Sequence, residues 1–232
     1  MATAPQQLPV INDPAVHLVR GEGGLALVGE GMELRCDLAS MLPRIKQSKL
    51  AHELLVRAVR LKGVAEPYAI DATAGFGEDA LLLAAAGFHV QLFERDPVIA
   101  ALLADGLARA AEHPQLAPIV ARMRLTPGNS IQALQAHATT DGAKPDVVYL
   151  DPMFPTRTKS AAVKKKFQLL HHLEAPCTNE EELLRAAVAA GPRKVVIKRP
   201  AKGPLLAGIK PSYSIAGKAV RYDCIVPASI KL

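Results

Sequence analysis

The fold is constrained most by one glycine-bearing stretch, Asp71-Ala-Thr-Ala-Gly75-Phe-Gly77-Glu78-Asp79. A short apolar run (67–70) precedes it, and an alanine- and leucine-rich run (80–86) follows it and stops at Gly87. These runs predict a buried strand, a glycine turn and a helix. Because glycine has no Cβ, the turn can be sharp and a ligand can lie against the backbone at the helix N-terminus. Taken alone, the stretch also fits a plain strand-to-helix turn with acidic residues at the start of the helix.

The composition indicates a globular protein with an anionic partner. Half of the 232 residues are hydrophobic, which is enough for a sizeable core. Lysine and arginine total 28 against 22 acidic residues, and the net charge of +6 favours a partner such as nucleic acid.

The three cysteines, Cys36, Cys177 and Cys224, are scattered and lack the spacing of metal ligands, so we expect neither a disulfide nor a metal site. The N-terminus does not resemble a signal peptide, and no apolar run approaches the length of a membrane span. A cytoplasmic location is therefore expected.

Residues 1–62 are predicted to form an N-terminal extension, and residues 63–232 the main domain. The extension should contain a hairpin with strands 25–28 and 32–36, followed by a helix from Lys49 to Leu61 capped by Ser48. Basic side chains near the start of this helix could contact RNA, although a solvated face is the simpler interpretation.

Strands and helices alternate along the main domain. Apolar runs predict further strands at 89–93, 123–125, 146–150 and 194–198. Helices are expected from Pro97 towards Ala110, over 160–173, and from a capping box of Thr178 and Glu181 to Ala190. Segments 212–215 and 220–226 read as an antiparallel hairpin that closes the sheet edge. The pattern predicts an α/β fold with a mostly parallel sheet covered on both faces.

Polar residues follow four of the predicted strands, where an open parallel sheet binds its ligands. They are Asp71 with the glycine stretch, Glu94, Asn129 with Ser130, and Asp151 with Pro152. Glu94 lies about twenty residues beyond the glycines, where an acid can accept hydrogen bonds from ribose hydroxyls. A nicotinamide cofactor is also compatible with this loop, because Ala80 occupies the position of the third glycine and alanine is tolerated there.

The segment Asp151-Pro152-Met153-Phe154-Pro155 has the layout of the loop found in methyltransferases that act on exocyclic amines of bases, with methionine replacing the second proline. Asp151 can accept N–H hydrogen bonds from the amine, and Phe154 can stack on the base. The alternative is a rigid proline turn with a core phenylalanine.

Together these motifs resemble the ribosomal RNA small subunit methyltransferase J family, which methylates the guanine N2 of 16S rRNA. The resemblance covers about 71–223 and rests on 71–79, 93–95, 149–155, 159–165 and 198–200. It implies a class I, Rossmann-like methyltransferase with a seven-stranded, mostly parallel sheet and a C-terminal antiparallel hairpin.

The resemblance also implies S-adenosyl-L-methionine as methyl donor and S-adenosyl-L-homocysteine as product, with no metal. The implied catalytic residues are Asp151, Pro152 and Phe154, and the cofactor contacts are Asp71, Gly75, Gly77, Glu78, Asp79, Glu94, Arg95, Asn129, Ser130 and Asp151. Two positions depart from the family pattern: Glu78 replaces a basic residue, and Asn129 stands where a small hydroxyl residue is usual.

Lys159, Lys164, Lys165 and Lys166 follow the Asp-Pro loop closely, so a base held at Phe154 would bring its phosphates near them. We predict that they bind RNA. The alternative is that they form the solvent face of a helix that buries Val163, Phe167 and Leu170.

The expected function is S-adenosylmethionine-dependent methylation of a guanosine N2 in 16S rRNA of the small ribosomal subunit. One alternative is an N6-adenine methyltransferase, and another is an NAD(P)-dependent oxidoreductase, for which no histidine lies at the predicted rim. A non-catalytic RNA-binding protein would explain the charge but would not need Glu94 or Asp151. An aromatic content of 4% also argues against a stacking platform.

Overall fold

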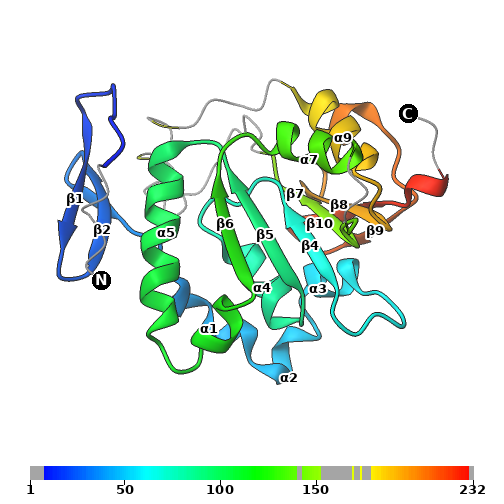
Figure 1. The fold of residues 1–232 in the computed structure, drawn as a ribbon, viewed down its shortest axis with the longest axis horizontal. Helices are drawn as coiled ribbons and strands as arrows, with labels where there is room; N and C mark the ends of the chain where they lie inside the picture. The colour runs from blue at the N-terminus through cyan, green and yellow to red at the C-terminus, as the bar shows by residue number, and fades with distance from the viewer. Residues whose placement is uncertain (1–7, 140–142, 153–168, 170–172, 174–178, 230–232) are drawn as a thin grey trace.

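The computed structural model describes residues 8–139, 143–152, 169, 173 and 179–229. Two sheets are present in this part of the chain, a three-stranded one near the N-terminus and a seven-stranded one that forms the centre of the molecule (Figure 1). No helix in these ranges is long and apolar enough to cross a membrane.

The central sheet confirms the predicted fold class. Its strands are β4 (Tyr68–Asp71), β5 (His89–Glu94), β6 (Met123–Pro127), β7 (Val147–Leu150), β8 (Lys194–Pro200), β9 (Tyr213–Ala216) and β10 (Val220–Ile225), in the order β6-β5-β4-β7-β8-β10-β9. The pairs from β6 through β8 are parallel, and β10 runs antiparallel to both β8 and β9. The chain leaves β4 in one direction and later returns to its other side at β7. The switch point of the topology therefore lies between β4 and β7.

Helices cover both faces of the sheet (Figure 1). One face packs against α4 (Glu78–Ala85) and α5 (Pro97–Ala111), and the other against α7 (Ser130–Thr139) and α9 (Glu180–Ala189). Successive residues of β7 belong to opposite cores, with Val147 and Tyr149 facing the first and Val148 and Leu150 the second. This is the alternation expected of a strand buried on both sides.

Helix α5 begins where the sequence predicts. The side chain of Asp96 accepts hydrogen bonds from the backbone N–H groups of Val98 and Ile99, and Pro97 occupies the first turn. The short helix α6 (Ala117–Val120) and helix α7 were not predicted. The expected helix over 160–173 falls almost wholly outside the described residues, as does Thr178; the N-cap of α9 is Asn179.

The N-terminal sheet contains the predicted hairpin, β2 (Gly24–Gly29) with β3 (Met32–Leu34), and one unpredicted strand, β1 (Val16–Gly21). This sheet lies beside α5 (Figure 1). Arg20 of β1 forms an ion pair of 2.9 Å with Asp105 of α5. Cys36, which follows β3, belongs to the same hydrophobic core as α4 and α5.

The prediction of one helix from Lys49 to Leu61, capped by Ser48, is wrong. Two short helices, α2 (Gln47–Leu50) and α3 (Leu54–Val59), occupy this region after α1 (Leu42–Ile45), and Ser48 lies inside α2. The break falls at Glu53, whose backbone is extended (φ −62°, ψ 128°). From there its carboxylate accepts two 2.8 Å hydrogen bonds from Arg44. This bidentate ion pair, which links residues nine apart, accompanies a break in an otherwise helical pattern.

Candidate functional site

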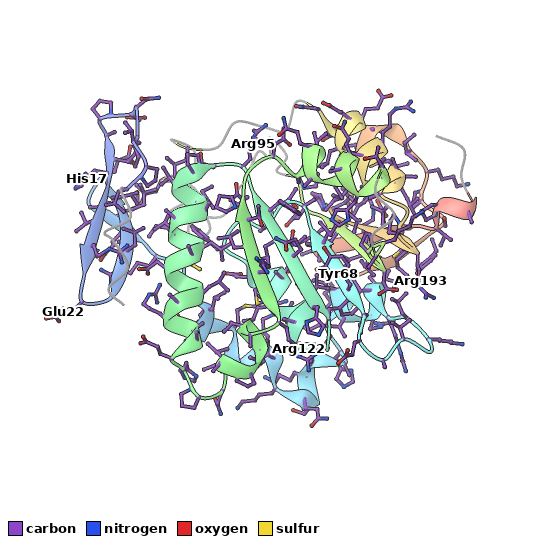
Figure 2. The ribbon with its side chains drawn as sticks, viewed as in Figure 1. His17, Glu22, Tyr68, Arg95, Arg122 and Arg193 are labelled. Carbon is purple, nitrogen blue, oxygen red and sulfur yellow. The ribbon has the colours of Figure 1, made fainter. Side chains whose placement is uncertain are left out.

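A cavity of about 930 Å³ lies at the carboxyl ends of β4, β5 and β7. Residues that follow all four predicted strands line it, so the structure brings together the rim that the sequence predicts. Figure 2 shows Arg95 at this end of the sheet and Tyr68, Arg122 and Arg193, near the starts of β4, β6 and β8, towards the opposite end. Among the described residues its lining carries six acidic side chains and three basic ones, which favours a cationic or hydroxyl-rich ligand.

The glycine loop uses its two glycines differently. Gly77 is the N-cap of α4 with φ 73°, and an added Cβ would lie 2.8 Å from Leu103 Cδ1. Gly75 also has a positive φ of 53°, but a Cβ there would meet nothing within 4 Å, and Gly75 lines the cavity. Gly77 is therefore required by the turn and its packing, whereas Gly75 leaves open space beside the loop.

Glu94 ties the end of β5 to the glycine loop. Its Oε2 accepts a 2.8 Å hydrogen bond from the backbone N–H of Gly75, and its Oε1 accepts one of 2.9 Å from Asp96. Burial raises the pKa of Glu94, and these backbone donors oppose that effect. Each oxygen keeps a further lone pair, so the carboxylate can still accept a ligand hydroxyl.

Asp71 and Thr73 fix the other side of the loop. Asp71 is 1% exposed, and its Oδ1 accepts a 3.1 Å hydrogen bond from the backbone N–H of Thr73. Burial raises the pKa of Asp71 well above its ordinary value. The hydroxyl of Thr73 accepts a 2.6 Å hydrogen bond from the backbone N–H of Asp151. Thus the loop is bonded both to Glu94 at the end of β5 and to Asp151 at the end of β7.

Lys198 of β8 stands between two carboxylates. Its Nζ lies 2.6 Å from Asp79 Oδ2 and 2.9 Å from Asp151 Oδ2. The hydroxyl of Tyr149 donates to the same Asp79 oxygen at 2.7 Å. Although burial opposes it, the two carboxylates raise the pKa of Lys198, so the ammonium is charged. Burial raises the pKa of Asp151, and Lys198 lowers it.

The remaining predicted residues that the structure describes lie at the same end of the sheet. Asn129 and Ser130 line the cavity, but the Asn129 side chain also accepts a 3.0 Å hydrogen bond from Ile131 N–H at the start of α7. Glu78 and Arg95 line the cavity with exposed side chains, and Pro152 lines it while buried. Phe154 and the four lysines Lys159, Lys164, Lys165 and Lys166 lie outside the described residues.

Several residues that line the cavity were not predicted as site residues, among them Arg44 on α1, Tyr149 on β7, Lys198 on β8 and Tyr222 on β10. A signal existed for Lys198, because the predicted strand 194–198 ends there and strand ends define the rim. No comparable signal existed for Tyr222, which lies on an antiparallel strand. For Arg44 there was no such signal either, because only tertiary packing brings α1 to the rim.

The shape and the lining residues of the cavity suit a ligand such as S-adenosylmethionine. Gly75 leaves open space along the loop, and the Glu94 oxygens can accept ribose hydroxyls. The excess of carboxylates suits a positively charged sulfonium.

Comparison with known proteins gives a consistent result. A family described as "Putative SAM-dependent methyltransferase" matches residues 7–227. A ribosomal RNA small subunit methyltransferase J from Thioalkalivibrio sulfidiphilus is 49% identical over 218 residues, covering 92% of this chain and 85% of that protein. The protein of the same name from Pseudomonas aeruginosa is 49% identical over 171 residues, covering 74% of this chain. The chain covers only 64% of the length of that relative, less than two thirds.

Two solved structures are also similar. A SAM-dependent methyltransferase from Neisseria gonorrhoeae superposes with a TM-score of 0.75 at 33% identity, covering all of this chain and 88% of that one. The rRNA methyltransferase AviRa from Streptomyces viridochromogenes gives a TM-score of 0.52 at 18% identity over 79% of this chain and 86% of that one. The second likeness shows a shared fold alone.

Proposed function

Because the chain belongs to the ribosomal RNA small subunit methyltransferase J family, we propose that it methylates the exocyclic N2 amine of a guanosine in 16S rRNA. The cofactor is S-adenosylmethionine. The proposed partner is 16S rRNA, free or in the small ribosomal subunit, and the proposed location is the cytoplasm.

One observation carries the proposal: the glycine loop is hydrogen-bonded both to Glu94, which is proposed to bind the cofactor, and to Asp151, which is proposed to bind the acceptor amine. Its Gly75 N–H is bonded to Glu94, and its Thr73 hydroxyl to the backbone of Asp151. Both carboxylates line one cavity. A donor held at Glu94 and an amine held at Asp151 would therefore share a fixed frame, and such alignment is where a transfer enzyme gains most of its rate.

S-adenosylmethionine would be held at Glu94 and beside Gly75. It would supply a methyl group activated by a positively charged sulfur, and the electron pair of the broken carbon–sulfur bond would stay on sulfur as the nitrogen takes the methyl. Asp151 accepts an N–H hydrogen bond from the amine and so orients the nitrogen lone pair. The nitrogen gains positive charge during the attack, which the ionised Asp151 stabilises. The surplus proton then passes from the nitrogen to Asp151 or to water, so the product amine is neutral.

The test incubates the purified protein with radiolabelled cofactor and with either deproteinised 16S rRNA or assembled small subunits that lack the modification. Nucleosides from digested RNA are then identified by mass spectrometry. We expect N2-methylguanosine from at least one of the two substrates. N6-methyladenosine would favour the adenine alternative, and the absence of label in both substrates would refute the proposal.

A further inference from the structure

We propose that Lys198 is a positioning residue, which holds the Asp151 carboxylate in place and in its charged form for the acceptor amine. The inference rests on the methyl transfer proposed above and adds a residue to its machinery. Lys198 itself need not touch either substrate, since it acts through Asp151.

The geometry around Lys198 comes from three separate elements. Its Nζ contacts Asp151 Oδ2, at the end of β7, at 2.9 Å, and Asp79 Oδ2, in the first turn of α4, at 2.6 Å. Asp79 is fixed in turn by the hydroxyl of Tyr149, which is 1% exposed. Because the lysine is anchored on its Asp79 side, it can set the orientation of the Asp151 side chain.

The two carboxylate oxygens of Asp151 therefore have different surroundings. Oδ2 is held by Lys198, while Oδ1 accepts no hydrogen bond from any described residue. With 38% of its side chain exposed, Asp151 can present Oδ1 to a ligand in the cavity. One oxygen thus serves orientation, and the other is available for the amine.

Lys198 also influences whether Asp151 is charged. Burial and the neighbouring Asp79 carboxylate raise the pKa of Asp151, and Lys198 opposes them. Without the ammonium, Asp79 and Asp151 would face each other with no lysine between them, and Asp151 would bind a proton at higher pH. A protonated carboxyl would lose the charge that stabilises the developing cationic nitrogen.

Other charged or titratable groups around this pair come from every neighbouring strand. Those that interact electrostatically with Asp151, Asp79 or Lys198 are Asp71 on β4, Tyr149 on β7, Arg199 on β8, Tyr222 on β10 and Arg44 on α1. Burial and the Asp79 carboxylate raise the pKa of Tyr222 above its ordinary value, so this tyrosine is uncharged at neutral pH. Lys198 is the only cation of this set that directly contacts both carboxylates among the described residues.

The variants that test the role are Lys198→Met, which removes the charge, and Lys198→Arg, which keeps it. Lys202→Met is the matched control, because Lys202 is exposed, lies just beyond β8 and does not line the cavity. Urea unfolding of each variant establishes that it folds. The measurements are kcat, and KM for 16S rRNA, between pH 5.5 and 9.5, together with calorimetric affinity for S-adenosylmethionine.

We expect Lys198→Met to move the acidic limb of the kcat profile to higher pH by about one unit or more. At pH values below the limb, kcat of the variant should then be at least about tenfold lower than that of wild type. This difference between variant and wild type should shrink at alkaline pH. Lys198→Arg should restore the position of the limb, and Lys202→Met should match wild type. An unmoved limb, or a loss confined to cofactor affinity, would overturn the inference.

A readout independent of turnover separates this inference from the proposed function. The Asp151 carboxyl is titrated by carbon-13 NMR, with its signal assigned from Asp151→Asn. Lys198→Met should raise the pKa of Asp151, and an unchanged pKa would refute the role of Lys198. If wild type methylates no 16S rRNA, the proposed function fails, yet the titration still decides whether Lys198 controls Asp151.

Discussion

Glu94 at the end of β5 accepts a 2.8 Å hydrogen bond from the backbone N–H of Gly75, nineteen residues earlier in the chain. The acid that the sequence assigns to the ribose therefore also holds the glycine loop. A single carboxylate can shape the cavity and bind a ligand there, so changes at Glu94 should affect the loop and the cofactor together.

Glu94→Ala should weaken S-adenosylmethionine binding by about 1.5–3 kcal/mol, because a charged hydrogen-bond acceptor is lost. Glu94→Gln keeps one acceptor oxygen and should lose less. Calorimetry measures both affinities. If Glu94→Ala bound S-adenosylmethionine as tightly as wild type, Glu94 would not be the residue that binds the ribose.

Asp151→Ala should lower kcat and kcat/KM together while leaving cofactor affinity nearly unchanged, because its interaction with the amine strengthens as the nitrogen becomes cationic. Steady-state kinetics with 16S rRNA and calorimetry with the cofactor separate the two effects. A loss seen only in the cofactor dissociation constant would show that Asp151 serves the donor.

Gly77→Ala should destabilise the protein more than Gly31→Ala. Both glycines have a similar positive φ, 73° and 70°, so each substitution costs about 1–2 kcal/mol of backbone strain. Only Gly77 meets a neighbour, Leu103, and that contact should add about 1–3 kcal/mol. Urea unfolding measures the difference, and equal midpoints for the two variants would contradict the packing argument.

Asp71→Asn should change how stability depends on pH. The pKa of Asp71 is raised by burial in the folded state, so its contribution is fully present below the unfolded value of about 3.9 and is lost as the pH rises through the folded value. An asparagine never ionises. The stability of the variant relative to wild type should therefore increase from about pH 4 upwards, as measured by urea unfolding without cofactor. A difference that does not vary with pH would contradict this assignment.

The lysines Lys159, Lys164, Lys165 and Lys166 remain a prediction from the sequence, since they lie outside the described residues. If they neutralise phosphates, each Lys→Ala variant should flatten the log-log salt dependence of RNA binding by about 0.7–0.9, without changing cofactor affinity. We expect two or three of the four to do so. If all four variants showed the same slope as wild type, the RNA-binding surface would have to be sought around Arg44 and Lys46 instead.

Family membership decides between the alternatives that the glycine loop leaves open. Glycines and a strand-end acid occur in nicotinamide-dependent enzymes as well, so the loop alone could not exclude an oxidoreductase. The added segment from Asp151 to Pro155 favours methyl transfer, and the match over residues 7–227 places the chain among the SAM-dependent methyltransferases.

The sequence by itself determined the strands of the central sheet and the residues that form its rim. Short apolar runs such as Val147–Leu150 favour buried strands by their length, and the parallel strands of one sheet end at one edge. The positions of Asp71, Glu94 and Asp151 at that edge therefore follow from local pattern and chain order.

Tertiary structure alone decided the contacts that shape the site. Glu53 breaks the predicted helix where it pairs with Arg44, and Lys198 joins Asp79 to Asp151 across three elements. Such contacts link residues whose separation in sequence carries no periodicity, so no local pattern encodes them. They form only when packing brings the elements together and burial makes an unpaired charge too costly to leave.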